Sequence, residues 1–282
     1  MQGRRRRDDL LVLGIAVTVA CMLSMVSVRA QTAGHALPAY EDLPDWSGVW
    51  QMIGPTIFDT ATAEPKGGRA GDPGLRSHPP YNAAWEAKYV ANIELIAEGQ
   101  FPDPLTTCGL PPGFPRVFNL PGAIEFIVRP EQVWILTEDG PSITRIYTDG
   151  RSHPPPDEVW PTFSGESVGH WEGDVLVFET IGMKGEEQRI LDRTGLILSE
   201  QARVTTRLRR IDASTMEARL TIEDPEALTA PWQVAKRYER LPDGSRMFDV
   251  ACAENNRNPV LPDGTTLTLD AEGNVLDAEY GD

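Results

Sequence analysis

The sequence is short of the residues from which most metal centres and redox sites are built. It has three cysteines and four histidines in 282 residues. It contains no Cys-x-x-Cys or His-Glu-x-x-His pattern, no phosphate-binding loop and no dinucleotide-binding fingerprint. These absences argue against zinc-binding, nucleotide-binding and redox classes. We therefore expect no resident metal ion and no cofactor.

Basic residues are also scarce. Lys and Arg number 26 against 42 Asp and Glu, so the formal net charge is −16. Without residues 1–30, which hold five arginines and two aspartates, the net charge is −19. Nucleic acid and anionic membranes repel such a chain. We expect a small-molecule ligand or substrate, neither nucleic acid nor, after processing, a membrane.

The N-terminus has the pattern of a secretory signal peptide. Four arginines at 4–7 precede an apolar stretch from Leu10 to Val26, and Val28-Arg29-Ala30 suits signal peptidase. We predict cleavage after Ala30 and a periplasmic or secreted mature protein. An uncleaved anchor is the alternative, because about 17 apolar residues lie at the lower limit for spanning a bilayer.

Two cysteines remain after this cleavage, Cys108 and Cys252. An even pair in an oxidising compartment predicts a disulfide. Two buried free thiols are the alternative.

The pattern along the chain predicts an all-β protein. Residues 31–104 contain a polar leader, a first strand, a long loop and one helix, Asn82–Glu98, capped by Asn82. Residues 105–258 form the barrel core, and 259–282 an acidic hairpin or tail. The predicted strands of the core are 123–129, 133–138, 143–149, 164–171, 174–181, 201–211, 216–224, 232–241 and 247–253. The best fit is an antiparallel, lipocalin-like (calycin-type) β-barrel with long loops.

The most informative stretch is 164–180. If Glu172-Gly173 is a two-residue turn, Glu166 lies directly opposite Glu179, and His170 shares their sheet face. Opposed carboxylates point to water, hold a cation between them or share a proton. In the last case Glu166, Glu179 and His170 are candidate catalytic acid/base groups. A Ser-His-Asp hydrolase is unsupported, since Ser167 falls on the other face.

A second set of candidates lies on the strand before it. Arg145, Tyr147 and Asp149 share one face, where they would hold a carboxylate or phenol or stabilise an oxyanion. Trp171 is a further candidate for binding substrate. A structural ion-pair network with no ligand is the alternative.

Several segments resemble a family of exported bacterial proteins of unassigned function. These are Tyr147-Thr148-Asp149-Gly150-Arg151, Gly169-His170-Trp171-Glu172-Gly173-Asp174 with Leu176-Val177, Leu198-Ser199-Glu200, Thr221–Pro225 and Ala230-Pro231-Trp232. The resemblance covers about residues 105–255. It implies a cross-strand His–Asp pair where this chain has Glu166 and Glu179. The segment Gly48-Val49-Trp50 also resembles the Gly-x-Trp of lipocalins.

Two functions fit these observations. The first is a cofactor-free acid/base enzyme (an isomerase, hydratase, lyase or hydrolase) acting on a small, partly apolar or aromatic molecule in the barrel mouth. The second is a periplasmic carrier or scavenger that uses the same residues only to hold its ligand.

Overall fold

The structure is a computed structural model that describes residues 37–59, 79–100, 112–140, 142–185, 190–192 and 194–250, together with Asp103, Leu105 and Leu261. The predicted signal peptide, Cys108, Cys252 and the predicted acidic hairpin around 270–274 lie outside these residues.

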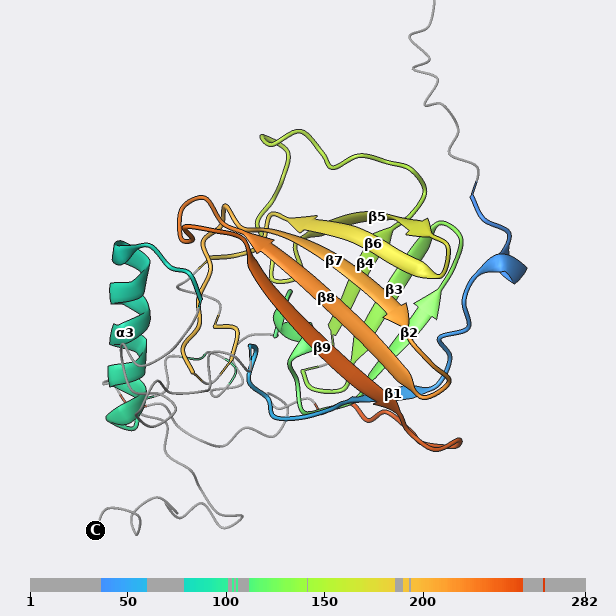
Figure 1. Cartoon of the computed structure of the whole chain (residues 1–282), viewed down its shortest axis with the longest axis horizontal. Helices are drawn as coiled ribbons and strands as arrows, with labels where there is room; N and C mark the ends of the chain where they lie inside the picture. The colour runs from blue at the N-terminus through green and yellow to red at the C-terminus, as the bar shows by residue number, and fades with distance from the viewer. Residues whose placement is uncertain are drawn as a thin grey trace, which may run out of the picture. The chain divides into compact units, whose positions relative to one another are not determined.

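The described residues form a closed nine-stranded barrel in which each strand pairs with its neighbours in sequence and β9 pairs with β1 (Figure 1). The strands are β1 (Val49–Met52), β2 (Ile124–Val128), β3 (Gln132–Thr137), β4 (Ser142–Tyr147), β5 (Glu166–Glu172), β6 (Val175–Ile181), β7 (Arg203–Arg210), β8 (Thr215–Glu223) and β9 (Trp232–Arg240). The predicted all-β barrel is confirmed. Closure pairs every strand on both sides, so the sheet has no open edge.

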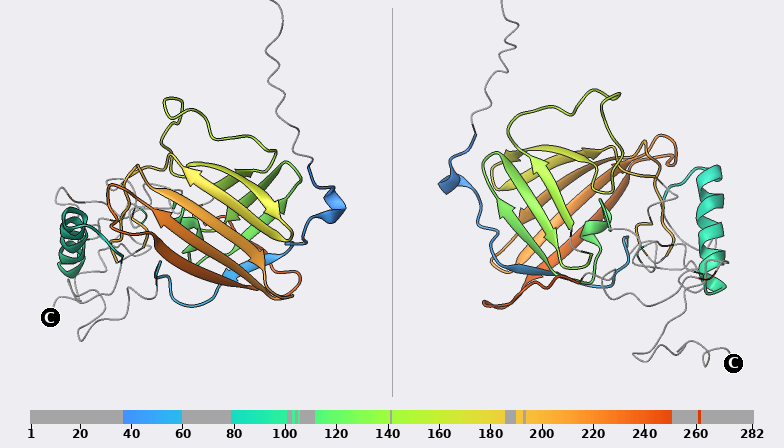
Figure 2. Two further views of the ribbon diagram at one scale, coloured as in Figure 1. Left: turned by 45° about the horizontal axis from the view of Figure 1, so that its top comes forward. Right: turned by 180° about the vertical axis from the view of Figure 1, so that it is seen from behind.

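One pairing differs from the expected antiparallel pattern. β4 and β5 are parallel, with Ile146 beside Ser167 and Tyr147 beside Val168. A parallel neighbour needs a long crossover, which residues 148–165 supply. This segment, hereafter the crossover loop, leaves the end of β4 and returns beside β5 (yellow-green in Figures 1 and 2).

The prediction of a strand at 247–253 is wrong for residues 247–250, the part of this range that the structure describes. Residues 247–250 make a single bridge, Val250 beside Asp139, in which the amide of Val250 donates to Glu138 O at 3.0 Å. Pairing between β9 and β1 already closes the barrel, so no strand position remains for this segment.

The predicted helix is confirmed as α3 (Ala83–Ala97). The Asn82 side chain accepts hydrogen bonds from the amides of Ala84 and Trp85, both at 3.1 Å. Two shorter turns, η1 (Tyr40–Asp42) and η3 (Arg116–Phe118), complete the helical elements of the described residues. None of the described helices has the length and apolar character needed to cross a bilayer.

Most of the side chains that face into the barrel are apolar and buried. Strand positions alternate between buried and exposed most clearly along β7 and β9, as a two-residue period requires. Phe114, just before η3, and Phe118, its last residue, add aromatic rings to this core. The ring centroids of Phe114 and Phe178 lie 5.8 Å apart. The Tyr238 hydroxyl donates to Phe118 O at 2.6 Å. The η3 segment therefore packs against the inner face of β9.

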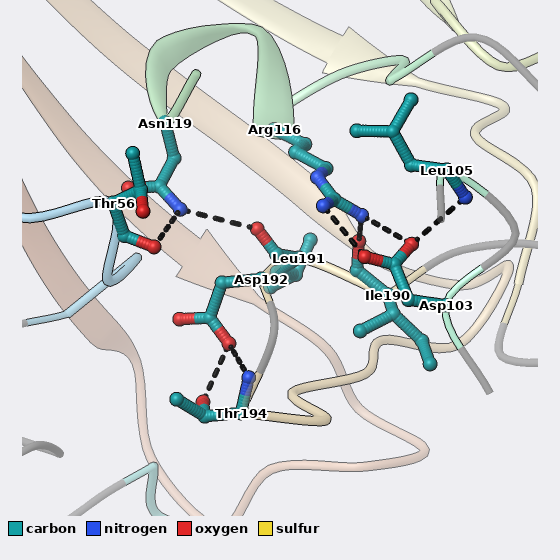
Figure 3. A network of polar contacts seen from close by, with 9 residues as sticks. All are labelled: Thr56, Asp103, Leu105, Arg116, Asn119, Ile190, Leu191, Asp192 and Thr194. Atoms are coloured by element: carbon teal, nitrogen blue, oxygen red, sulfur yellow. Dashed lines mark hydrogen bonds and ion pairs between the residues drawn. The ribbon is translucent and has the colours of Figure 1, made fainter. Parts of the chain in front are cut away.

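Buried polar groups join the loops around η3 (Figure 3). Arg116 donates to both oxygens of Asp103 at 2.7 Å and to Ile190 O at 2.7 Å. Asn119 donates to Leu191 O at 3.4 Å, and the Asp192 carboxylate accepts from the amide of Thr194 at 2.8 Å. These hydrogen bonds thus tie together segments that are far apart in the sequence.

Lys236 is an inward-facing cation on β9. Its ammonium group donates to Ile57 O and, at 2.8 Å, to Asn119 Oδ1. Burial lowers the pKa of Lys236 to about 8, although Asp192 and Asp59 partly offset this effect. The side chain thus fastens the segment before Asp59 to the η3 segment.

Candidate functional site

Glu166 and Glu179 lie on the outer face of the barrel, and the register between them differs from the prediction. Glu172 pairs with Val175, so the hairpin loop is Gly173-Asp174 and not Glu172-Gly173. Gly173 has φ +60°, which the first position of a two-residue hairpin loop requires and glycine adopts most easily.

The corrected register separates the two carboxylates. Glu179 lies opposite Val168, and Glu166 lies opposite Ile181. The expectation that the glutamates directly oppose each other is therefore wrong. They share one sheet face as diagonal neighbours, a separation of about 7–8 Å that leaves room for a third group.

That third group is His153, which the crossover loop lays against this face. Its Nε2 lies 3.3 Å from Oε1 of Glu179, and its side chain is only 14% exposed. Neither imidazole nitrogen has a well-aligned hydrogen-bond partner among the described residues. Burial lowers the pKa of His153, an effect that the negative charges of Glu179 and Glu166 oppose. The imidazole is therefore neutral at pH 7.

The two glutamates play different parts around this histidine. Glu179 forms an ion pair with Arg203 of β7, so its carboxylate is held between a fixed cation and the imidazole. The Glu166 carboxylate has no hydrogen-bond or ion-pair partner among the described residues, yet its charge acts on both His153 and Arg151. One carboxylate is thus anchored and the other is available. We name His153, Glu166, Glu179 and Arg203 the histidine cluster.

Tyr147 flanks the histidine cluster. Pairing places Tyr147 beside Val168 and Val168 beside Glu179, so one row crosses β4, β5 and β6. The guanidinium of Arg151 lies 3.8 Å from the centre of the Tyr147 ring. Arg151 also pairs with Asp149 at 2.6 Å and lowers the pKa of that carboxyl group. Tyr147 and Asp149 are therefore linked through Arg151.

The other predicted site residues lie apart from this row. Arg145 is exposed on β4, where its guanidinium lies 5.5 Å from the centre of the Trp134 ring. His170 is 52% exposed and approaches Glu172, on its own strand, at 3.3 Å. Trp171 alternates to the inner face and packs on Trp46, with ring centroids 5.2 Å apart. His153 thus occupies the place near the glutamates that was predicted for His170.

His153 is not among the candidate site residues predicted from the sequence. Its position follows from the crossover loop, which has to return from the end of β4 to the start of β5. The proline-rich composition of that segment, with Pro154, Pro155 and Pro156, predicted a loop but not its path.

The segment 165–169 reads Gly-Glu-Ser-Val-Gly, the Gly-x-Ser-x-Gly spelling of a nucleophile elbow. Such an elbow needs a sharp turn from a strand into a helix that exposes the serine. Here Ser167 lies within β5, is buried, and has its Oγ 2.8 Å from Oγ1 of Thr180. Ser167 is therefore a core residue of the barrel.

No described group of three or more His, Cys, Asp or Glu side chains is arranged to hold a metal ion. The chemistry supported by the described residues at the histidine cluster is proton transfer. A neutral imidazole accepts a proton, and a carboxylate anchored beside it stabilises the cation that results.

Comparisons with known proteins assign no family. No protein-family model matches this chain, and no curated protein matches it significantly. In its described residues, the chain is an all-β protein built on a closed nine-stranded barrel with a single α-helix.

Proposed function

We propose that this chain is an exported β-barrel protein that carries out cofactor-free acid/base chemistry on a small, partly apolar or aromatic molecule. The observation that carries the proposal is the shielded imidazole of His153, 3.3 Å from a glutamate that Arg203 already binds. A largely shielded histidine with a lowered pKa beside an anchored carboxylate is the arrangement that a general base needs.

The roles follow from the contacts. His153 removes a proton from the substrate, and Glu179 stabilises the imidazolium that forms. The imidazolium then returns this proton at a second atom of the substrate, and Glu166, the carboxylate without a described partner, is placed to relay it. Tyr147 supplies an aromatic surface beside the cluster. Isomerisation, hydration and elimination all need this pair of proton transfers.

The reactive site lies on the outer face of the barrel, under the crossover loop. Aromatic core residues and the η3 segment pack against the inner faces of the strands, which argues against the barrel mouth as the ligand site. We keep export, cleavage after Ala30 and the Cys108–Cys252 disulfide as parts of the proposal, along with membership of the exported family that the motifs resemble.

Native mass spectrometry of protein purified from its host compartment tests the export steps. Cleavage predicts a chain that begins at Gln31, and the disulfide predicts a mass about two daltons below that of the reduced form. A chain that keeps residues 1–30 would indicate the anchor instead.

Variants at the histidine cluster test the chemistry. The wild-type protein is screened against small carbonyl, enol and unsaturated acid substrates, and the active substrate is then tried with His153→Gln and Glu166→Gln. We expect a loss of turnover of 100-fold or more, on the order of a general base's contribution, with substrate binding retained. His170→Gln is the matched control. Variants that lose only affinity would indicate a carrier.

A further inference from the structure

A second cluster of charged side chains lies away from the histidine cluster, on the outer face of β7, β8 and β9. The register sets Arg207 directly opposite Arg219. In the adjacent row, Glu217 lies between Arg209 and Arg237. We name these five residues the arginine cluster.

Glu217 is the centre of the cluster and is covered by its neighbours. It accepts from Arg219 at 2.7 Å and from Arg209 at 2.9 Å, and it pairs with Arg237 at 3.2 Å. The Glu217 side chain is 2% exposed, whereas the side chains of Arg219 and Arg237 are each 60% exposed. The carboxylate thus fixes three guanidinium groups that keep N–H groups in contact with solvent.

The arginine cluster carries more positive charge than is needed to neutralise the Glu217 carboxylate. One arginine neutralises one carboxylate, yet three bind Glu217. Arg207 directly opposes Arg219, and like charges in that position destabilise a sheet. Glu172 binds Arg207 at 2.8 Å, which leaves an excess of two positive charges over four arginines and two glutamates. This excess occurs in a chain whose net charge is −16.

The geometry suits an anion with several oxygens. Guanidinium groups bind phosphate and carboxylate oxygens through paired N–H donors, and each such charge-assisted bond is stronger than a neutral one. Arg219 is already fixed by Glu217 and Arg207 by Glu172, so both guanidinium groups lose little conformational entropy on binding. An anion that spans Arg207 and Arg219 would also remove the repulsion between them.

We infer that the arginine cluster binds a small, multiply charged oxyanion, of the phosphate or sulfate type, across Arg207 and Arg219. The ligand is small because the rest of the chain is acidic. At physiological salt, charges are screened over about 8 Å, so a small ion at the cluster experiences mainly the local positive charge. An extended anionic surface would also contact the acidic parts of the chain.

Isothermal titration calorimetry with inorganic pyrophosphate at low salt tests this inference. We expect one site per chain. We also expect that Arg207→Gln and Arg219→Gln each lower the affinity about tenfold, the effect of one lost charge-assisted bond. Arg145→Gln, an exposed arginine on β4, is the matched control and should bind as the wild type does. Arg207 makes no contact with Glu217, so Arg207→Gln also tests the site with the three Glu217 ion pairs intact.

Two further binding measurements define the chemical class of the ligand. Inorganic phosphate should bind more weakly than pyrophosphate because it carries less charge. Phosphatidylglycerol vesicles should not retain the protein in sedimentation. Absence of pyrophosphate binding, equal weakening by Arg145→Gln, or binding to vesicles without binding to pyrophosphate would each overturn the inference.

Discussion

Val159 packs against Gly182 so closely that a β-carbon at position 182 would lie 2.4 Å from Val159 Cγ1. The amide of Thr162 donates to Gly182 O at 3.0 Å, and Lys184 donates back to Thr162 O at 3.0 Å. These contacts fasten the returning end of the crossover loop beside the end of β6. The same loop carries His153, so the position of the imidazole depends on this contact.

Gly182→Ala should displace the crossover loop. Gly182 has φ +62°, and the added methyl group would also collide with Val159, so the loop has to move away from the barrel. We expect His153 to become more exposed and its pKa to rise toward 6.5, which NMR titration of the imidazole would measure.

Gly173→Ala separates the collision from the backbone effect. Gly173 has φ +60°, but an added β-carbon there meets nothing within 4 Å. This control should lose about 1 kcal/mol of stability from backbone strain and leave the His153 titration unchanged. Equal pKa changes in the two variants would contradict the role assigned to Val159.

His153 should make the stability of the fold sensitive to mild acid. Its pKa in the folded state lies below the 6.5 of an unperturbed histidine. The unfolded chain therefore binds a proton first as the pH falls, and stability present above pH 6.5 is lost below it. Urea unfolding at pH 7.5 and 5.5 should show a smaller loss for His153→Gln than for the wild type. His170→Gln should behave as the wild type.

Lys236 should make the stability of the fold depend on pH in the alkaline range. Its pKa of about 8 lies below the usual 10.5, so between these values the unfolded chain holds a proton that the folded chain has released. Stability then rises with pH by about 1.4 kcal/mol per unit from this group. Unfolding at pH 7.5 and 9.5 should show this rise in the wild type and not in Lys236→Met. The same rise in both proteins would show that another group causes it.

Glu217 should stabilise the barrel at all but very low pH. Hydrogen bonds from Arg219 and Arg209, partly offset by burial, lower the pKa of Glu217 from 4.5 to about 2. Its contribution is present above pH 4.5 and is lost as the pH falls toward 2. Glu217→Gln should lower the free energy of unfolding at pH 6 by about 1–3 kcal/mol, with a smaller difference at pH 3.

Glu239→Gln is the control for Glu217. Glu239 is an exposed outer residue on the neighbouring β9, so its substitution should change the free energy of unfolding by less than about 0.5 kcal/mol. A similar loss in the two variants would mean that the three arginines add nothing specific at Glu217.

Glu166 and Glu179 show how far a strand pattern predicts a site. That they share one sheet face was predictable, because alternation along each strand fixes which residues lie together, but the pattern did not show that this face is the outer one. Their direct opposition was not, because it depended on which two residues form the turn. A turn displaced by one residue shifts the pairing by two and preserves the face. The prediction of a shared face was therefore correct, although the predicted direct contact was wrong.

The sequence by itself determined the β class of the core, most strand positions and the capped helix at Asn82, because these depend on short-range periodicity and local hydrogen bonds. Only the tertiary structure decided the parallel pairing of β5 with β4, the residue opposite each glutamate on the neighbouring strand, and the placement of His153. These depend on the path of the crossover loop and on contacts such as that between Val159 and Gly182. Such contacts join residues whose spacing in the chain carries no periodic signal, so packing alone selects them.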